Sequence, residues 1–385
     1  MNINDLLKIA VASGASDLHL KVGSYPMMRL NGTLVVASEQ KRLERTDTES
    51  MAATLFSPDH LERFRTTQEV DLAYSVSNLG RFRCNVYQQR GSVALVLRVI
   101  PTRVKPIDEL GLPPVLKRIA SEERGLVLVT GTTGSGKSTT LAAMIDYINA
   151  SRSANIMTVE DPIEYLHRDH HSLVSQREVS VDTKSFATAL RSALRQDPDV
   201  ILVGEMRDFE TVETALLAAE TGHLVFSTLH TLDATETINR IITVFPPHQQ
   251  RQVRLQLASV LKAAVSQRLL PRADGLGRVA AVEVMVTTPF IRDCIVDKDK
   301  TSLINSSIAA GTSQYGMQTF DQSIFSLYQQ GFVTLDEAMR WASNVDEFKL
   351  KVQGIATTGE MSRDAMAQKA GIGVGGIPEI TRFGG

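Results

Sequence analysis

Cysteine, long apolar runs and net charge are all scarce in this sequence of 385 residues. The two cysteines, Cys84 and Cys294, exclude a four-cysteine zinc site and make a disulfide framework improbable. No run of about 18 apolar residues occurs, so no membrane-spanning helix is expected. The start, MNINDLLKIAVASGASD, has no basic segment before an apolar one and is unlike a secretory signal. These absences predict a cytoplasmic protein, and any association with a membrane would go through a partner.

The charge balance also excludes a class of partners. The formal net charge is −2, so no bulk field draws the protein to nucleic acid or anionic lipid. No basic and aromatic stripe is present either, and we expect no nucleic-acid partner. A hydrophobic content of 43% and a charged content of 22% are ordinary for a globular protein. The length suggests two or three domains.

The first 99 residues read as a small α+β domain. Asn4 or Asp5 can cap a short amphipathic helix that Gly14 ends. Asn31-Gly32 between two apolar arms is a strong hairpin signal. The predicted strands of this domain are 18–22, the two arms within 27–36, 71–76, 82–89 and 93–100.

The pattern changes after a linker, predicted at 100–116, that begins with the proline-rich IPTRVKP. Four apolar strands then alternate with helical stretches, which predicts βαβ units and a parallel sheet in a core spanning 117–345. These strands are 126–130, 155–160, 199–205 and 224–230. Residues 317–345 read as helical, with Thr334 and Glu337 at capping-box spacing. The glycine-rich tail, 346–385, is expected to be partly disordered.

One loop in this core carries a specific chemical signal. GTTGSGKS at 131–138 fits the phosphate-loop pattern at every required position, between an apolar strand and a helix. Glycines let main-chain N–H groups turn toward phosphate oxygens, and the helix adds its unpaired donors. Lys137 supplies a cation for the β- and γ-phosphates, and Ser138 a hydroxyl for Mg²⁺. The predicted nucleotide-binding residues are Gly131, Thr132, Thr133, Gly134, Ser135, Gly136, Lys137, Ser138 and Thr139.

Carboxylates end two other apolar strands. TVEDPIE places Glu160, Asp161 and Glu164 where parallel strands face a ligand crevice, although Asp-Pro is also an ordinary turn initiator. DVILVGEMRD ends in Gly204-Glu205, the place of the acidic residue that holds Mg²⁺ through water in phosphate-loop enzymes. From spacing alone Glu164 is undecided, whereas Glu205 is favoured as functional.

His223 and His230 lie at either end of the last of these apolar strands. On spacing alone, each is more simply explained as a hydrogen-bonded structural group than as a catalyst.

These blocks, in this order, resemble the secretion and pilus ATPase superfamily, and more closely the type IV pilus retraction ATPases. The resemblance covers about residues 1–345. It is carried by GASDLHL, GRFRCN, RGLVLVTGTTGSGKSTTLAAMID, EDPIEYLH, SQREV, ALRQDPDVILVGEMRD, ETGHLVFSTLHT and GMQTFDQ. It implies a PAS-like N-terminal domain, a RecA-like core and a homo-hexamer with ATP and Mg²⁺ between subunits. An inner-membrane platform protein, pilin indirectly and a paralogous retraction ATPase are the implied partners.

The resemblance also implies roles for individual residues. Glu164 becomes the general base, and Glu205 the support for Mg²⁺ and water. His223 and His230 match a histidine box that senses nucleotide state. The arginines on or beside the N-terminal strands, read from the sequence alone as solvated strand-face residues, become fingers toward nucleotide. These are Arg81, Arg98 and, less firmly, Arg83.

One stretch departs from the family pattern. Retraction ATPases carry an AIRNLIRE box, and FIRDCIVD at 290–297 stands in its place. Arg292 is kept, while Val296 replaces the second arginine. The resemblance thus predicts an ATP-hydrolysing retraction motor, with three alternatives. An accessory motor of the same family and a nucleotide-gated adaptor without turnover stay open. An assembly or type II secretion ATPase is disfavoured by the short N-terminal region and the lack of a four-cysteine element.

Overall fold

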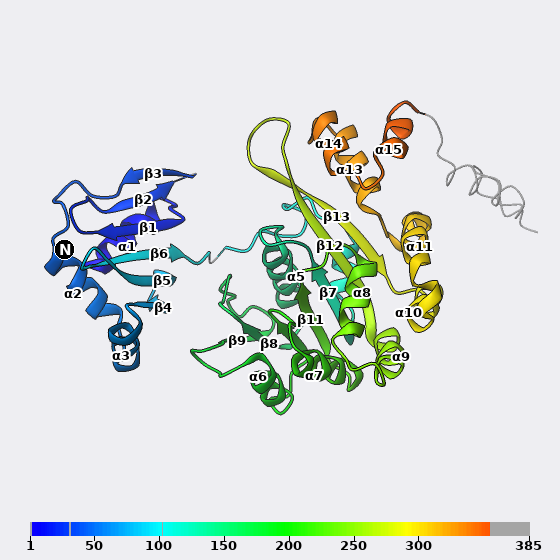
Figure 1. Cartoon of the computed structure of the whole chain (residues 1–385), viewed down its shortest axis with the longest axis horizontal. Coiled ribbons are helices and arrows are strands. Elements are labelled where there is room, and N and C mark those ends of the chain that lie inside the picture. Colours follow the sequence, from blue (N-terminus) through cyan, green and yellow to red (C-terminus); the bar gives the residue numbers. More distant parts are fainter. Residues whose placement is uncertain (1, 31, 102, 355–385) are drawn as a thin grey trace, which may run out of the picture. The chain divides into compact units, whose positions relative to one another are not determined.

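The computed structural model describes residues 2–30, 32–101 and 103–354. The chain divides into two compact units. One comprises the residues up to Leu110, Leu116–Leu128 and Lys137–Leu229; the other comprises Gly111–Val115, Val129–Gly136 and the residues from His230 onward. Figure 1 follows the elements along the chain. No helix in the described ranges is long and apolar enough to span a bilayer.

A six-stranded antiparallel sheet forms the N-terminal part, in the order β3-β2-β1-β6-β5-β4. Its strands are β1 (Asp17–Lys21), β2 (Met27–Leu30), β3 (Thr33–Val36), β4 (Glu69–Val76), β5 (Gly80–Gln89) and β6 (Ser92–Val99). All six predicted strands are confirmed, and β2 and β3 pair as the expected hairpin. Helices α1 (Ile3–Ala12), α2 (Arg45–Leu55) and α3 (Pro58–Thr67) complete this part; the sequence predicted only the first.

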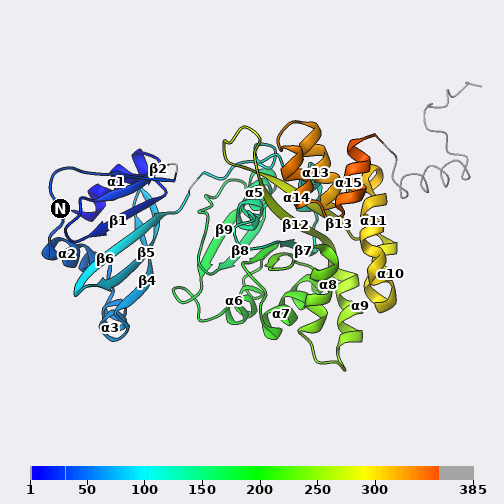
Figure 2. The same cartoon turned by 45° about the horizontal axis from the view of Figure 1, so that its top comes forward.

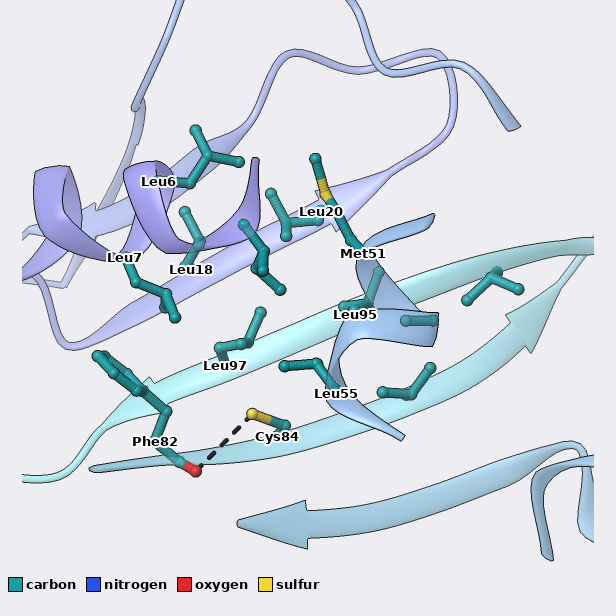
Figure 3. Close-up of a cluster of buried hydrophobic side chains, with 14 of the residues drawn as sticks. Leu6, Leu7, Leu18, Leu20, Met51, Leu55, Phe82, Cys84, Leu95 and Leu97 are labelled. Atoms are coloured by element: carbon teal, nitrogen blue, oxygen red, sulfur yellow. Dashed lines mark hydrogen bonds between the residues drawn. The ribbon is translucent and has the colours of Figure 1, made fainter. Parts of the chain in front are cut away.

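One apolar cluster holds this α+β part together. It joins side chains of α1, α2, β1, β5 and β6, among them Leu6, Met51, Leu18, Phe82 and Leu97 (Figure 3). Cys84 belongs to this cluster, and its thiol donates to the Phe82 carbonyl oxygen at 3.7 Å. Burial raises the pKa of the Cys84 thiol to about 12, so it packs as an apolar group and stays protonated.

The second sheet has seven strands in the order β13-β12-β7-β11-β10-β8-β9. Its parallel strands are β7 (Gly125–Thr130), β8 (Asn155–Glu160), β9 (Leu173–Glu178), β10 (Val200–Val203) and β11 (Leu224–Leu229). Every residue of β7, β10 and β11 is buried, as expected of parallel strands covered on both faces. Helices α5 (Lys137–Ser151), α6 (Phe186–Ala193) and α7 (Phe209–Glu220) connect them, which confirms the predicted βαβ pattern.

The remaining elements follow β11. An antiparallel hairpin, β12 (Leu261–Pro271) and β13 (Arg278–Val286), ends the sheet. Helices α4 (Val115–Ala120), α8 (Ala234–Thr243), α9 (Gln250–Val260), α10 (Pro289–Val296), η1 (Lys298–Leu303), α11 (Ile304–Ala310) and α12 (Thr312–Tyr315) were not individually predicted. Helices α13 (Phe320–Gln329), α14 (Leu335–Trp341) and α15 (Val345–Val352) lie next to one another (Figure 2). Thr334 caps α14 by accepting from the N–H of Glu337, as predicted. Of the predicted tail, residues 355–385 lie outside the described part.

Candidate nucleotide-binding site

The loop between β7 and α5 requires glycine for both backbone angle and space. Gly131, Gly134 and Gly136 have φ values of +139°, +79° and +93°, which side chains disfavour. A Cβ atom on Gly131 would lie 2.4 Å from the main-chain oxygen of Gln267, and one on Gly136 would lie 3.1 Å from its Nε2 atom. Gln267 is a buried residue of β12. This loop is therefore shaped by the strand beside it as well as by its own sequence.

Two polar side chains of the loop and of the first turn of α5 are buried. Ser135 is 3% exposed, and its hydroxyl has no hydrogen-bond partner among the described residues. Buried hydroxyls are normally paired, so a ligand oxygen in the loop would satisfy it. Lys137 is 9% exposed, and burial lowers the pKa of its ammonium group, while the negative charge of Glu205 opposes that shift. The charges of Lys137 and Glu205 therefore interact.

Gly204 brings the ends of β8 and β10 close together. Its N–H donates to the Val159 carbonyl oxygen at 2.7 Å. A Cβ atom at this position would lie 3.3 Å from the Cα atom of Glu160. Glu205 follows, 17% exposed, and pairs with Arg207 at 2.6 Å between Oε1 and Nε. Glu205, the carboxylate predicted to support the metal, therefore follows a residue that packs against the end of β8. Its negative charge acts on the ammonium group of Lys137.

The predicted acidic segment starts at Glu160, the last residue of β8. The Oε1 atom of Glu160 accepts from the Thr158 hydroxyl at 2.7 Å, and its Oε2 atom accepts from the N–H of Glu164 at 3.4 Å. Desolvation raises the pKa of Glu160, more than these hydrogen bonds lower it. Glu164 itself is exposed, and the next residue, Tyr165, shares a hydrogen bond with the Thr139 hydroxyl at 2.9 Å. That bond ties the acidic segment to the first turn of α5.

The two histidines lie at opposite ends of strand β11. His223 precedes β11, and its carbonyl oxygen accepts from the N–H of Gly125, the first residue of β7. About 17 Å of strand separates that end of β7 from the phosphate loop. The structure therefore does not bring His223 to the loop of its own chain. His230 follows the carboxyl end of β11, at the edge where the phosphate loop begins. Both sensing roles stay predictions.

Three arginines from the predictions share one face of the N-terminal sheet. Arg81 and Arg83 alternate with buried residues on β5, and Arg83 is directly opposite Arg98 on β6. The Arg98 Nε atom donates to Asp17 at 3.0 Å, and Arg81 donates to Oε2 of Glu178 at 3.0 Å. Arg83 and Arg98 are exposed, whereas Arg81 is mostly buried. The finger role of these arginines stays a prediction.

Sequence reasoning missed a buried carboxylate under the loop that follows β11. Glu283 of β13 is 2% exposed and accepts from the N–H of Ala234, the first residue of α8, at 2.9 Å. Burial raises the pKa of Glu283 to about 7; the charges of Asp233 and Asp321 add to the rise, and Arg268 opposes it. The signal available in the sequence was a lone acidic residue inside the apolar strand AAVEVMV.

This raised pKa predicts a stability that falls with pH. Between pH 4.5 and about 7 the folded chain keeps a proton on Glu283 that the unfolded chain has released. The free energy of unfolding therefore decreases by up to ~3 kcal/mol across that window and is flat above it. Glu283→Gln keeps the acceptor for Ala234 without the charge, so it should match the wild type at pH 5 and melt a few °C higher at pH 8. A wild-type-minus-variant difference in melting temperature that is constant from pH 5 to 8 contradicts this.

Together these features define a class of protein. The arrangement is that of a phosphate-loop nucleotide site. It combines a parallel sheet, a glycine loop between strand and helix, a desolvated lysine, and carboxylates at the ends of neighbouring strands. A family described as type II/IV secretion system protein matches residues 1–340, and the chain belongs to this family. The predicted resemblance to secretion and pilus ATPases, and the α/β fold class that it implied, are confirmed.

Individual relatives are similar over nearly the whole chain. The type IV pilus retraction ATPase PilT of Pseudomonas aeruginosa is 45% identical, covering 90% of this chain and 100% of that protein. The type IV pilus ATPase PilU of the same organism is 40% identical, with 92% of each chain covered. The crystal structure of the pilus retraction motor PilT with bound ADP has a TM-score of 0.83 and 47% identity; it covers 90% of this chain and 98% of that one.

Proposed function

We propose that this chain hydrolyses ATP as a hexameric motor for type IV pilus retraction, the basis of twitching motility. The similarity to PilT over the full length of that protein carries the proposal. The residues that the chemistry needs are present: the phosphate loop, the desolvated Lys137, and Glu205, whose charge acts on Lys137. ATP would bind at subunit interfaces, and its binding and release would alternately close and open the N-terminal part against the core. An inner-membrane platform protein would receive that motion and drive pilin out of the fibre.

Magnesium fits the donors at this site. Among the described residues no group of three or more His, Cys, Asp or Glu could hold a metal ion alone. A Mg²⁺ ion would therefore take part of its ligands from the nucleotide phosphates. The Ser138 hydroxyl and the Glu205 carboxylate are the hard oxygen donors that it prefers from the protein. When bound, the ion neutralises charge on the β- and γ-phosphates. The chain itself supplies the main-chain cradle, Lys137 against the phosphates, and Glu164 to take a proton from the attacking water.

The assignment of Glu164 as general base predicts a specific loss. Glu164→Gln should lower kcat by about 10²-fold, because a base of this kind contributes 10²–10⁴-fold. ATP affinity should stay within about threefold, since the phosphate loop is untouched. Phosphate release by the purified protein and binding of a fluorescent ATP analogue measure the two quantities. Glu213→Ala, at an exposed position of α7, is the matched control. Wild-type turnover in the Glu164 variant would remove it from this role, and no turnover in the wild type would favour the adaptor.

A second candidate, an accessory PilU-like motor, is favoured by one observation. FIRDCIVD stands in place of the family's AIRNLIRE box. All of it but the capping Asp297 lies on α10, and exposed Val296 stands where the second arginine would be. Deletion in the host, with counting of surface fibres, tests both candidates. Immobile fibres that accumulate support the main retraction motor, and unchanged fibres support the accessory role. Loss of fibres would overturn both, in favour of assembly.

A further inference from the structure

The side chain of Gln176 holds three points of the acidic segment at once. Gln176 lies on β9, the edge strand beside β8, and is half-buried. Its Nε2 group donates to Oε1 of Glu160 at 3.1 Å and to the carbonyl oxygen of Tyr165 at 2.9 Å. Its Oε1 atom accepts from the N–H of His167 at 2.8 Å. One amide group thus contacts residues on both sides of Glu164.

The segment needs such a contact because it has no regular structure of its own. Residues 161–172, all described by the structure, form neither helix nor strand. Their main-chain groups must find partners elsewhere if they are to stay in one conformation. Besides Gln176, the same strand supplies Glu178, whose Oε2 atom accepts from the N–H of Ile163 at 3.2 Å. Side chains of strand β9 therefore supply hydrogen-bond partners to the backbone on both sides of Glu164.

We propose that Gln176 is a positioning residue that sets the place of the Glu164 carboxylate relative to the phosphate loop. This inference rests on the proposed ATPase function. Glu164 is exposed, so its own packing does not fix it, and its location depends on the backbone before and after it. Gln176 fixes both sides, and the bond between Tyr165 and Thr139 connects the fixed segment to α5. A catalytic group held this way keeps the geometry that a proton transfer to a bound water requires.

The test separates positioning from a general structural role. Gln176→Leu keeps the size of the side chain and removes all three hydrogen bonds. We expect kcat to fall by about 30- to 100-fold, because a misplacement of about 1 Å can cost 10²-fold. ATP affinity should stay within about threefold. Gln330→Leu is the matched control: Gln330 is exposed at the end of α13, and its side chain donates to the hydroxyl of Ser326 in that helix. A kcat of Gln176→Leu within threefold of wild type overturns the proposal, and so does a parallel loss of ATP affinity and melting temperature.

A double-variant cycle asks whether Gln176 acts through Glu164. In a Glu164→Gln background, adding Gln176→Leu should lower kcat by less than about threefold, because groups that act as a unit are non-additive. Losses that multiply would mean that Gln176 acts independently, and the proposal would fail. The cycle also separates the two claims. If Glu164→Gln alone retains wild-type turnover, the assignment of the base fails; if only Gln176→Leu is silent, the positioning role alone fails.

A second variant keeps the test decisive if Gln176→Leu does not fold. Gln176→Glu preserves the acceptor for His167 but has no donor when ionised, and it puts a carboxylate beside Glu160. Its kcat relative to wild type should recover toward acidic pH, as the introduced carboxyl group takes up a proton and becomes a donor. A ratio of variant to wild-type kcat that is close to one at every pH from 5.5 to 8.5 overturns the proposal.

Discussion

Replacing Lys137 with alanine is expected to lower kcat/KM for ATP by about 10³-fold or more. The lysine is 9% exposed at the first position of α5, and burial already lowers its pKa, so little water competes for its charge. A preorganised charge in such a place stabilises phosphate oxygens far more than a surface lysine does. Its loss would also remove one positive charge that interacts with Glu205, Arg207 being another, and this adds repulsion toward a triphosphate.

The Lys137 prediction is checked with two measurements on the purified protein. Phosphate release gives kcat/KM, and titration with a fluorescent ATP analogue gives affinity, which should weaken by at least about tenfold. Lys8→Ala is a suitable control, because that lysine is 64% exposed and belongs to α1, away from the loop in sequence. A variant that binds and hydrolyses ATP as the wild type does would contradict the phosphate-loop assignment itself.

The phosphate loop could be located from sequence because its constraints are local. Gly131 and Gly136 adopt backbone angles that favour glycine, and consecutive residues supply the N–H cradle and the lysine. Glu205 was found for a similar reason, since an apolar run fixes where β10 ends. The end of the strand at which each histidine lies could also be predicted. His223 precedes the apolar run of β11 and therefore lies at the amino end of that parallel strand, whereas His230 follows it.

Other parts of the site depend on contacts between distant segments that no local pattern reveals. Gln267 fits against the glycine loop from a strand 131 residues further along than Gly136, and Gln176 holds the acidic segment from an edge strand. The sequence LVSQRE of β9 has little apolar character, so periodicity did not mark it as a strand. The helices α2 and α3 were missed although Ser57-Pro58 is a good helix start, because the segment between the predicted strands carries few apolar residues.

Replacing Glu205 with alanine should nearly abolish ATP hydrolysis while ATP still binds within about fivefold of the wild-type affinity. Glu205 follows Gly204, which packs against the end of β8, and its charge acts on Lys137. There the carboxylate can support Mg²⁺ and water, contacts that matter when charge develops in the transition state. Removing it releases Arg207, whose side chain is 76% exposed, so water replaces the lost ion pair at little cost in stability.

Comparing kcat with melting temperature in the Glu205→Ala variant distinguishes a loss of catalysis from a loss of folding. We expect kcat to fall by about 10³-fold, with a raised Mg²⁺ requirement for whatever turnover remains. Melting temperature should change by no more than a few °C, as for the control Glu213→Ala on the exposed face of α7. Equal losses of binding and hydrolysis would instead show that the carboxylate supports the fold of the site, because a group that acts only in the transition state leaves ground-state affinity in place.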